Sequence, residues 1–115
     1  MSSIKDAKLA NVGHQEVDWA ARQMKVLEDI KTEFSQNKPL EGLNIGACMH
    51  VTKETANLML TLKAAGANVA LCASNPLSTK DSVAAYLAEN DVKVHAVHGV
   101  SNDEFFTHLN AVLDT

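Results

Sequence analysis

The fold of this chain is decided by Ala47-Cys48-Met49-His50-Val51-Thr52-Lys53-Glu54-Thr55, where an apolar run gives way to polar residues and then to a helical pattern. The apolar run begins at Leu43 and has the length of a β-strand. The helical pattern has apolar residues three or four positions apart and stops at Gly66, a residue type that ends helices because it adopts positive φ without strain. The stretch therefore predicts a buried strand followed by a helix.

Three polar residues between this strand and this helix are candidates for a binding site. Thr52 is placed to cap the helix, and Glu54 falls in its first turn, where the helix dipole favours negative charge. Together with His50 they follow the carboxyl end of a strand, where open parallel α/β sheets bind ligands. The local pattern alone favours a simpler interpretation, because helix caps are commoner than sites. In that interpretation Thr52 and Glu54 only cap the helix, and His50 is a hydrogen-bonded loop residue.

Length and composition limit the class of protein. The 115 residues suit one domain, and 46% hydrophobic but only 4% aromatic residues predict a mainly aliphatic core. The net charge is −4 and the basic residues are dispersed, which argues against nucleic-acid or anionic-membrane partners. No apolar run is long enough to span a membrane, and the first ten residues lack a signal-peptide core, so we expect a soluble, cytoplasmic protein. Cys48 and Cys72 lie in apolar runs and are expected to be small buried residues, not a disulfide or a metal pair.

The rest of the chain repeats the plan of a strand followed by a helix. Residues 1–14 show no periodicity and are expected to be a mobile leader, whereas one helix is predicted from about residue 15 to residue 36. Further strands are predicted at 67–73 and 92–97, each followed by a helical pattern. The order α-βα-βα-βα predicts an α/β domain with a three-layer, Rossmann-like parallel sheet of about three strands, right-handed crossovers and helices on both faces.

Two serines predict where the later helices begin. Ser78 is followed three residues later by Asp81, and Ser101 is followed three residues later by Glu104. A hydroxyl with a carboxylate at this spacing is typical of a capped helix start. We therefore expect both serines to cap helices.

Polar residues also follow the second predicted strand. They are Ser74, Asn75, Ser78 and Thr79. Because the loops after consecutive parallel strands emerge at one edge of a sheet, these residues can share a cleft with the polar residues after the first strand. The combined set suits a nucleoside. A carboxylate accepts hydrogen bonds from an exocyclic amine, hydroxyls address ring nitrogens or ribose, and an imidazole moves a proton or orients a sugar hydroxyl.

Several other chemistries lack their residues. The first strand is followed by neither G-x-G-x-x-G nor a Walker pattern, so no complete phosphate-binding loop is present. His95 and His98 are three apart in a predicted strand, which sends their side chains to opposite faces and argues against a metal site. Cys48 and His50 have no obvious third partner for nucleophilic catalysis. A self-contained catalytic set is missing.

Four segments carry a resemblance to a known family. They are Lys38-Pro-Leu-Glu-Gly, Cys48-Met-His-Val-Thr-Lys-Glu-Thr-Ala, Leu62-Lys-Ala-Ala-Gly-Ala-Asn-Val and Ser74-Asn-Pro-Leu-Ser-Thr-Lys-Asp. In order and spacing they resemble the N-terminal part of the adenosylhomocysteinases, the S-adenosyl-L-homocysteine hydrolase family, and the resemblance runs from about Val17 to Leu113. It implies a tetrameric cytosolic enzyme that reversibly splits S-adenosylhomocysteine into adenosine and homocysteine. It also implies a tightly bound NAD that oxidises the ribose 3′-hydroxyl.

The resemblance assigns a role to five residues by their position in the matching segments. It implies that Thr52 and Glu54 contact the adenine edge and that His50 handles a proton near the ribose, as a catalytic residue. It further implies that Asn75 and Ser78 lie on the homocysteine side. The implied substrate-binding set is therefore Thr52, Glu54, Asn75 and Ser78.

The resemblance covers only part of the family's architecture. It implies a partial substrate-binding domain over residues 15–115, without the NAD-binding domain, so the isolated chain is expected to bind no NAD and to be inactive. Expected partners are adenosine or S-adenosylhomocysteine, together with a second copy or the remaining enzyme domains. Two alternatives stay open: a stand-alone adenosine-type binding module, and an assembly or regulatory protein that docks on the full-length enzyme.

Overall fold

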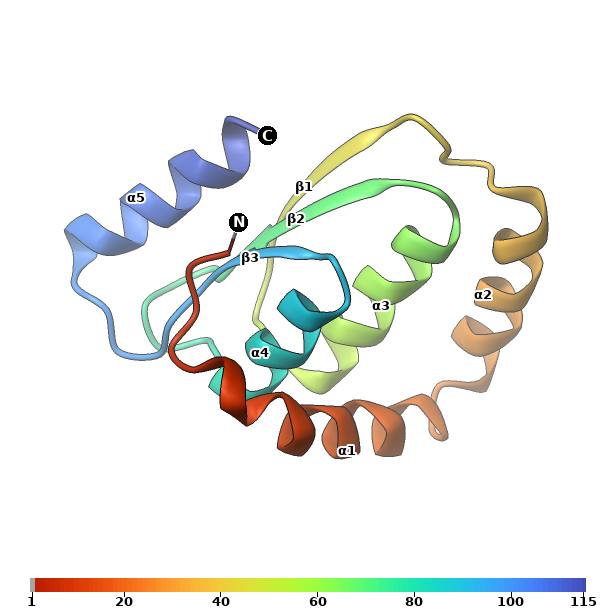
Figure 1. Cartoon of the computed structure of the whole chain (residues 1–115), viewed down its shortest axis with the longest axis horizontal. Helices are drawn as coiled ribbons and strands as arrows, with labels where there is room; N and C mark the ends of the chain where they lie inside the picture. Colours follow the sequence, from red (N-terminus) through yellow and green to blue (C-terminus); the bar gives the residue numbers. More distant parts are fainter. Residues whose placement is uncertain (1) are drawn as a thin grey trace.

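A parallel three-stranded sheet lies at the centre of the computed structural model, which describes residues 2–115 (Figure 1). The strands are β1 (Asn44–Cys48), β2 (Asn68–Cys72) and β3 (Lys93–His95), in the order β1-β2-β3. The helices are η1 (Ala7–Leu9), α1 (Ala10–Ala21), α2 (Lys25–Asn37), α3 (Lys53–Ala64), α4 (Asp81–Glu89) and α5 (Asn102–Leu113). The predicted α/β class, with a parallel Rossmann-like sheet, is confirmed.

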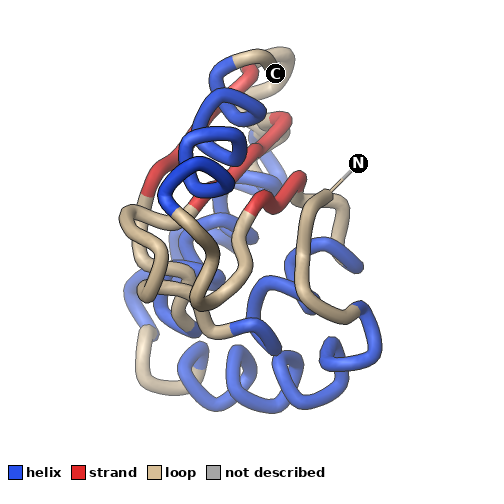
Figure 2. The backbone as a smooth tube through the Cα atoms, turned by 90° about the vertical axis from the view of Figure 1, so that its left-hand side faces the viewer, coloured by secondary structure: helices blue, strands red, loops and turns tan. Residues whose placement is uncertain are grey.

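Helices cover both faces of this sheet, as predicted. Alternate residues of β2 separate the two sides: Val69 and Leu71 join the large core beneath α3 and α4, whereas Ala70 and Cys72 contact Val112 of α5. Figures 1 and 2 show α5 crossing one side of the strands, with the other helices on the opposite side. The molecule thus has the three layers expected of a doubly covered parallel sheet.

The edge position of β1 changes its environment. Four of the five residues of β2 are buried, but the residues of β1 alternate between exposed and half-buried. The prediction of a buried first strand is therefore wrong, because β1 pairs with β2 on one side and is the first strand in the sheet order. For the same reason Cys48 is exposed and its predicted burial is wrong, whereas Cys72 is fully buried as predicted.

The first predicted helix is two helices. The chain leaves helical geometry at Met24, where φ is −115° and ψ is 57°, and α2 begins at the next residue. The prediction of one helix over residues 15–36 is therefore wrong: both pieces lie against α3, but α1 also lies against α4. The expected leader boundary at residue 14 falls inside α1.

The residues before α1 contact β3. Ser3 forms a parallel bridge with His95: its N–H donates to the Val94 carbonyl at 2.8 Å, and its carbonyl accepts from the Ala96 N–H at 2.9 Å. Ser2 adds a hydroxyl that accepts from the Val94 N–H at 2.9 Å. These bonds attach the N-terminal segment to the outer side of β3, and its predicted mobility stays a prediction.

Two of the predicted helix ends are confirmed. Gly66 follows α3 with φ of 101°, which a residue with a side chain adopts only under strain. Ser101 caps α5, since its Oγ accepts from the Glu104 N–H at 3.2 Å. Among residues 2–115, no helix combines the length and the apolar character that a membrane span requires.

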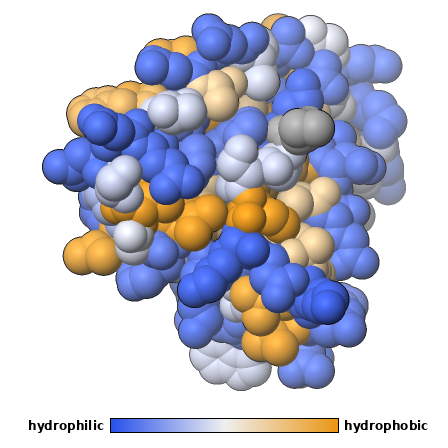
Figure 3. Space-filling view, turned by 60° about the vertical axis from the view of Figure 1, so that its left-hand side comes forward, coloured by the Kyte–Doolittle hydropathy of each residue, from blue (hydrophilic) through white to orange (hydrophobic). Residues whose placement is uncertain are grey.

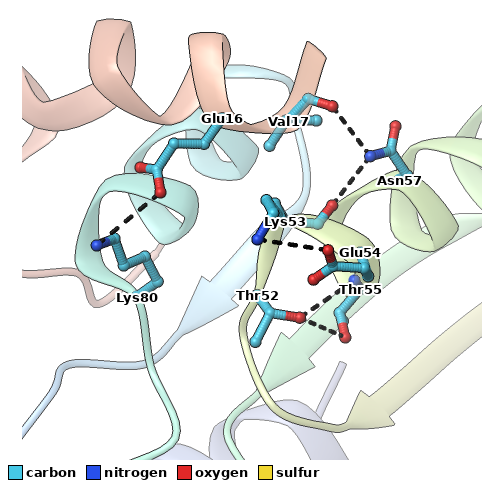
Figure 4. Close-up of polar contacts among 8 residues, drawn as sticks. All are labelled: Glu16, Val17, Thr52, Lys53, Glu54, Thr55, Asn57 and Lys80. Carbon is cyan, nitrogen blue, oxygen red and sulfur yellow. Dashed lines mark hydrogen bonds and ion pairs between the residues drawn. The ribbon is translucent and has the colours of Figure 1, made fainter. Parts of the chain in front are cut away.

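Three contacts fix α1 on the helices beneath it. Gly13 is buried at the crossing with α4, where an added Cβ would lie 2.0 Å from the carbonyl oxygen of Ser82. One turn on, Glu16 Oε1 accepts from Ser82 Oγ at 2.5 Å. Asn57 of α3 donates from Nδ2 to the carbonyls of Val17 at 3.1 Å and Lys53 at 2.9 Å (Figure 4). The helix pair α1 and α4 therefore packs backbone against backbone at a position that admits only glycine.

The outer helix α5 rests on a mixed polar and apolar contact. His108 of α5 is 6% exposed and its ring centroid lies 6.4 Å from that of His95, which is 9% exposed. Burial lowers the pKa of His95, and the neighbouring His108 and Lys93 lower it further. Phe106 and Leu113 lie on exposed parts of α5, and Figure 3 shows apolar groups among mainly hydrophilic ones on a view that brings this side forward.

Replacing Gly13 by alanine should lower the free energy of unfolding by about 3 kcal/mol, because the new Cβ meets backbone that cannot move aside without separating α1 from α4. Urea denaturation of the two proteins measures the difference. Asn11→Ala, at an exposed position of the same helix, is the control and should change stability by no more than about 0.5 kcal/mol. Equal stability of all three proteins would contradict the close crossing.

Stability should also fall in mild acid because of His95. Its folded-state pKa lies below the unfolded value of 6.5, so protonation favours the unfolded chain. The contribution of His95 to the unfolding free energy should be complete at pH values above its unfolded pKa. It should decline as the pH drops through the unfolded pKa toward the folded pKa. Urea denaturation across this range should show a smaller decline for His95→Gln, while His98→Gln, at an exposed position, should behave like the parent. The same decline in all three would exclude His95 as its source.

Candidate functional site

A backbone bridge joins the loops that follow β1 and β2. Val51 and Thr79 form a parallel bridge beyond the ends of the two strands. The Val51 N–H donates to the Ser78 carbonyl at 2.8 Å, and the Val51 carbonyl accepts from the Lys80 N–H at 2.9 Å. Val51 is fully buried, so the bridge is shielded from water. The prediction that both loops lie at one edge of the sheet is confirmed.

The first loop places its polar residues at the start of α3. Thr52 is half-buried, and its Oγ1 accepts from the Thr55 N–H at 3.4 Å, which confirms its capping role. The Glu54 carboxylate is 53% exposed in the first turn and lies 3.5 Å from Lys53 Nζ (Figure 4). His50 is exposed, two residues after the end of β1. The loop therefore presents an imidazole, a hydroxyl and a carboxylate in close succession.

The second loop uses its polar residues to hold its own turn. The Asn75 side-chain oxygen accepts from the Leu77 N–H at 2.8 Å. Ser78 Oγ accepts from the Asn75 N–H at 3.2 Å, donates to the Asn75 carbonyl at 3.1 Å and lies 3.3 Å from Ser74 Oγ. The turn fixes Asn75 and Ser78 beside the bridge to Val51.

The predicted cap at Ser78 is wrong. Helix α4 begins at Asp81, and its N-cap position is Lys80, which makes no side-chain capping bond. The Ser78 hydroxyl is instead occupied by Asn75, three residues before it, and the Ser78 carbonyl is occupied by Val51. The spacing of a hydroxyl and a carboxylate was thus insufficient to separate a helix cap from a turn.

Helix α1 contributes groups next to this edge that sequence periodicity did not predict. Glu16 Oε2 lies 3.9 Å from Lys80 Nζ (Figure 4), and Lys53 Nζ lies 5.7 Å from the centroid of the Trp19 ring. Gln15, Glu16, Trp19 and Lys53 line a hollow of about 300 Å³. Trp19 is a large apolar residue, yet it is 55% exposed.

The five predicted site residues thus lie on two adjacent loops and, for Glu54, in the first turn of α3. Both loops are held by backbone bonds, and His50, Glu54 and Asn75 are exposed. The arrangement offers donors and acceptors on an open surface and no enclosed catalytic group. No cluster of three or more His, Cys, Asp or Glu side chains suited to a metal occurs within residues 2–115.

The chain has close relatives among known proteins. The family model of S-adenosyl-L-homocysteine hydrolase matches residues 1–115. Proteins named adenosylhomocysteinase are 48% identical in Pyrococcus abyssi, 48% in Saccharolobus solfataricus and 49% in Aquifex aeolicus. Each alignment covers 96% of this chain but only 26%, 26% and 27% of the respective relative. The chain therefore spans about a quarter of the length of these relatives.

Replacing Thr52 by alanine should cost about 1 kcal/mol of unfolding free energy, because α3 loses its capping hydroxyl. Thr52→Ser keeps the acceptor oxygen and should retain most of the stability. Thermal or urea denaturation followed by circular dichroism distinguishes the two variants. If Thr52→Ala were as stable as Thr52→Ser, the hydroxyl would not be the cap.

Proposed function

Because the chain belongs to the S-adenosyl-L-homocysteine hydrolase family, we propose that it forms part of the substrate-binding region of such an enzyme. The proposed reaction of the longer protein is the reversible hydrolysis of S-adenosylhomocysteine to adenosine and homocysteine. In this proposal the loops after β1 and β2 form one side of the site for the adenosine group. The chain spans about a quarter of its relatives, so it is proposed to work together with the remaining enzyme domains and to be inactive alone.

The observation that carries this proposal is the bridge between Val51 and Thr79. It holds the two loops in register, so groups from both can contact one ligand. The Glu54 carboxylate is exposed in the first turn of α3 and is proposed to accept hydrogen bonds from the exocyclic amine of adenine. The hydroxyl of Thr52, fixed by its capping bond, is proposed to lie against the same edge of the base.

The other three residues are proposed to face the sugar and the amino-acid part. His50 lies two residues after β1 and carries an imidazole, which can donate or accept a hydrogen bond, so we assign it proton handling near the ribose. Asn75 uses its side-chain oxygen within the turn, which leaves the amide NH₂ as its donor for a ligand. Ser78 lies in the same turn and is assigned with Asn75 to the homocysteine side.

The resemblance also implies NAD, and the residues of this chain do not fit it. A pyrophosphate at the start of a helix needs glycines behind the preceding strand, so that backbone N–H groups can approach it. The connection from β1 to α3 contains no glycine, its Val51 is fully buried, and the Thr52 side chain occupies the capping position of α3. We therefore propose that NAD binds to a part of the enzyme that corresponds to the remaining length of the relatives, outside this chain. The enzyme is proposed to be cytoplasmic.

Isothermal titration of the folded chain with adenosine and with S-adenosylhomocysteine tests the proposal. Saturable binding is expected, and Glu54→Ala should weaken it by about 10-fold or more, the equivalent of one hydrogen bond to a charged group. Glu104→Ala is the matched control, because Glu104 is an exposed glutamate in the first turn of α5. It should leave binding unchanged.

Circular dichroism should show all three proteins folded before titration. Absence of saturable binding to the folded parent chain would overturn the proposal that the two loops bind the ligand without the other domains. Equal weakening in Glu54→Ala and Glu104→Ala would exclude the specific role of Glu54.

A further inference from the structure

A row of reactive side chains crosses the sheet beneath α5. Cys48 of β1 is in register with Cys72 of β2, and Cys72 is in register with His95 of β3. Residues in register on parallel strands point to the same face of a sheet. That face is the one covered by α5, because Cys72 contacts Val112 and His95 lies beside His108. The two cysteines are thus neighbours on the α5 side of the sheet.

The two thiols of this row lie on paired strands but in different environments. Cys48 is exposed, and its Sγ lies 3.5 Å from the carbonyl oxygen of Ala73. Cys72 is fully buried. Burial, the charge of Cys48 and a hydrogen bond with the Cys48 thiol raise the pKa of Cys72 to about 12. Cys72 is therefore held as a neutral thiol next to a thiol that solvent can reach.

The register of the strands suits a covalent bond between these thiols. Paired strands lie about 4.8 Å apart, and disulfides join residues whose Cα atoms are about 4.4 to 6.8 Å apart. Cys48 and Cys72 are direct partners in the ladder, with side chains on one face. A disulfide between them thus requires rotation of both side chains and a slightly closer approach of the two Cβ atoms, between residues that are already partners in the ladder.

We propose that Cys48 and Cys72 are a redox-sensitive pair that closes to a disulfide when a hydroperoxide reaches Cys48. This modification site is separate from the five residues assigned to the ligand. Cys48 is the first thiol to react, because it is an exposed residue whereas Cys72 is fully buried. Cys72 is the resolving thiol.

The chemistry balances in two steps. The Cys48 thiolate attacks one peroxide oxygen, the O–O bond breaks, and the second oxygen leaves as water or an alcohol after taking a proton from solvent. The resulting Cys48 sulfenic acid is then attacked by the Cys72 sulfur, which loses its proton. The S–O bond breaks and the leaving hydroxide takes that proton to become water. Two thiols are oxidised by two electrons in total, and one hydroperoxide is reduced.

The bond would tie the sheet at the base of the two loops. Cys48 and Cys72 are the last residues of β1 and β2, and the Met49 N–H already donates to the Cys72 carbonyl at 3.0 Å. Both loops leave the sheet from this point. Oxidation therefore fixes the ends of the two strands without using any side chain of the loops.

Treatment of the folded chain with hydrogen peroxide tests the proposal. We expect both free thiols to disappear together and the monomer mass to fall by two hydrogen atoms. Peptide mapping without reductant should link Cys48 to Cys72, and dithiothreitol should reverse the change. The oxidised protein should also melt at a higher temperature, because the cross-link restricts the unfolded chain.

Two variants test which cysteine reacts with the peroxide and which one then closes the disulfide. In Cys72→Ala, Cys48 should accumulate as sulfenic acid that dimedone traps. In Cys48→Ser, Cys72 should stay reduced under the same treatment, because it is fully buried. Circular dichroism checks that each variant is folded. The proposal is overturned if the parent chain forms only dimers linked between chains, or if Cys48 is oxidised to sulfinic acid while Cys72 keeps its thiol.

Discussion

The pairing of β2 with a parallel strand on each side is the constraint on which the structure depends. Both backbone edges of β2 are occupied, and its side chains must be covered on both faces, which is why α3 and α4 lie on one side and α5 on the other. The same pairing continues past the strand ends in the bridge of Val51 with Thr79. The loops that carry the candidate site are therefore extensions of the sheet and owe their alignment to it.

Local patterns in the sequence predicted the elements better than their environments. The strands and the later helices followed from periodicity, and the roles of Thr52, Gly66 and Ser101 followed from their local chemistry. The exposure of β1 could not follow from its apolar composition, because burial depends on the order of the strands in the sheet. The break at Met24 was not predictable from the sequence pattern, because apolar residues continue at helical spacing across it.

In the candidate site, too, the sequence predicted some features and missed those that depend on turn geometry or on packing between distant residues. Placement of the two loops at one edge followed from parallel topology, and the backbone bridge confirms it. The use of Ser78 in a turn with Asn75 was not predictable from spacing, because turns and helix caps draw on the same side-chain chemistry. Glu16 approaches Lys80 only through the packing of α1, and nothing in the local sequence links these distant residues.

The attachment of the N-terminal segment to β3 makes the two edges of the sheet unequal: one is covered and the other is open to a further strand. Ser2 and Ser3 occupy the N–H of Val94, its carbonyl and the N–H of Ala96, so the outer side of β3 has few groups left to pair with another strand. The outer side of β1 carries no such cover among residues 2–115. Within residues 2–115 the sheet therefore offers only its β1 edge for pairing with another strand. The short N-terminal segment thus blocks the β3 edge of the sheet from pairing with a strand of another molecule.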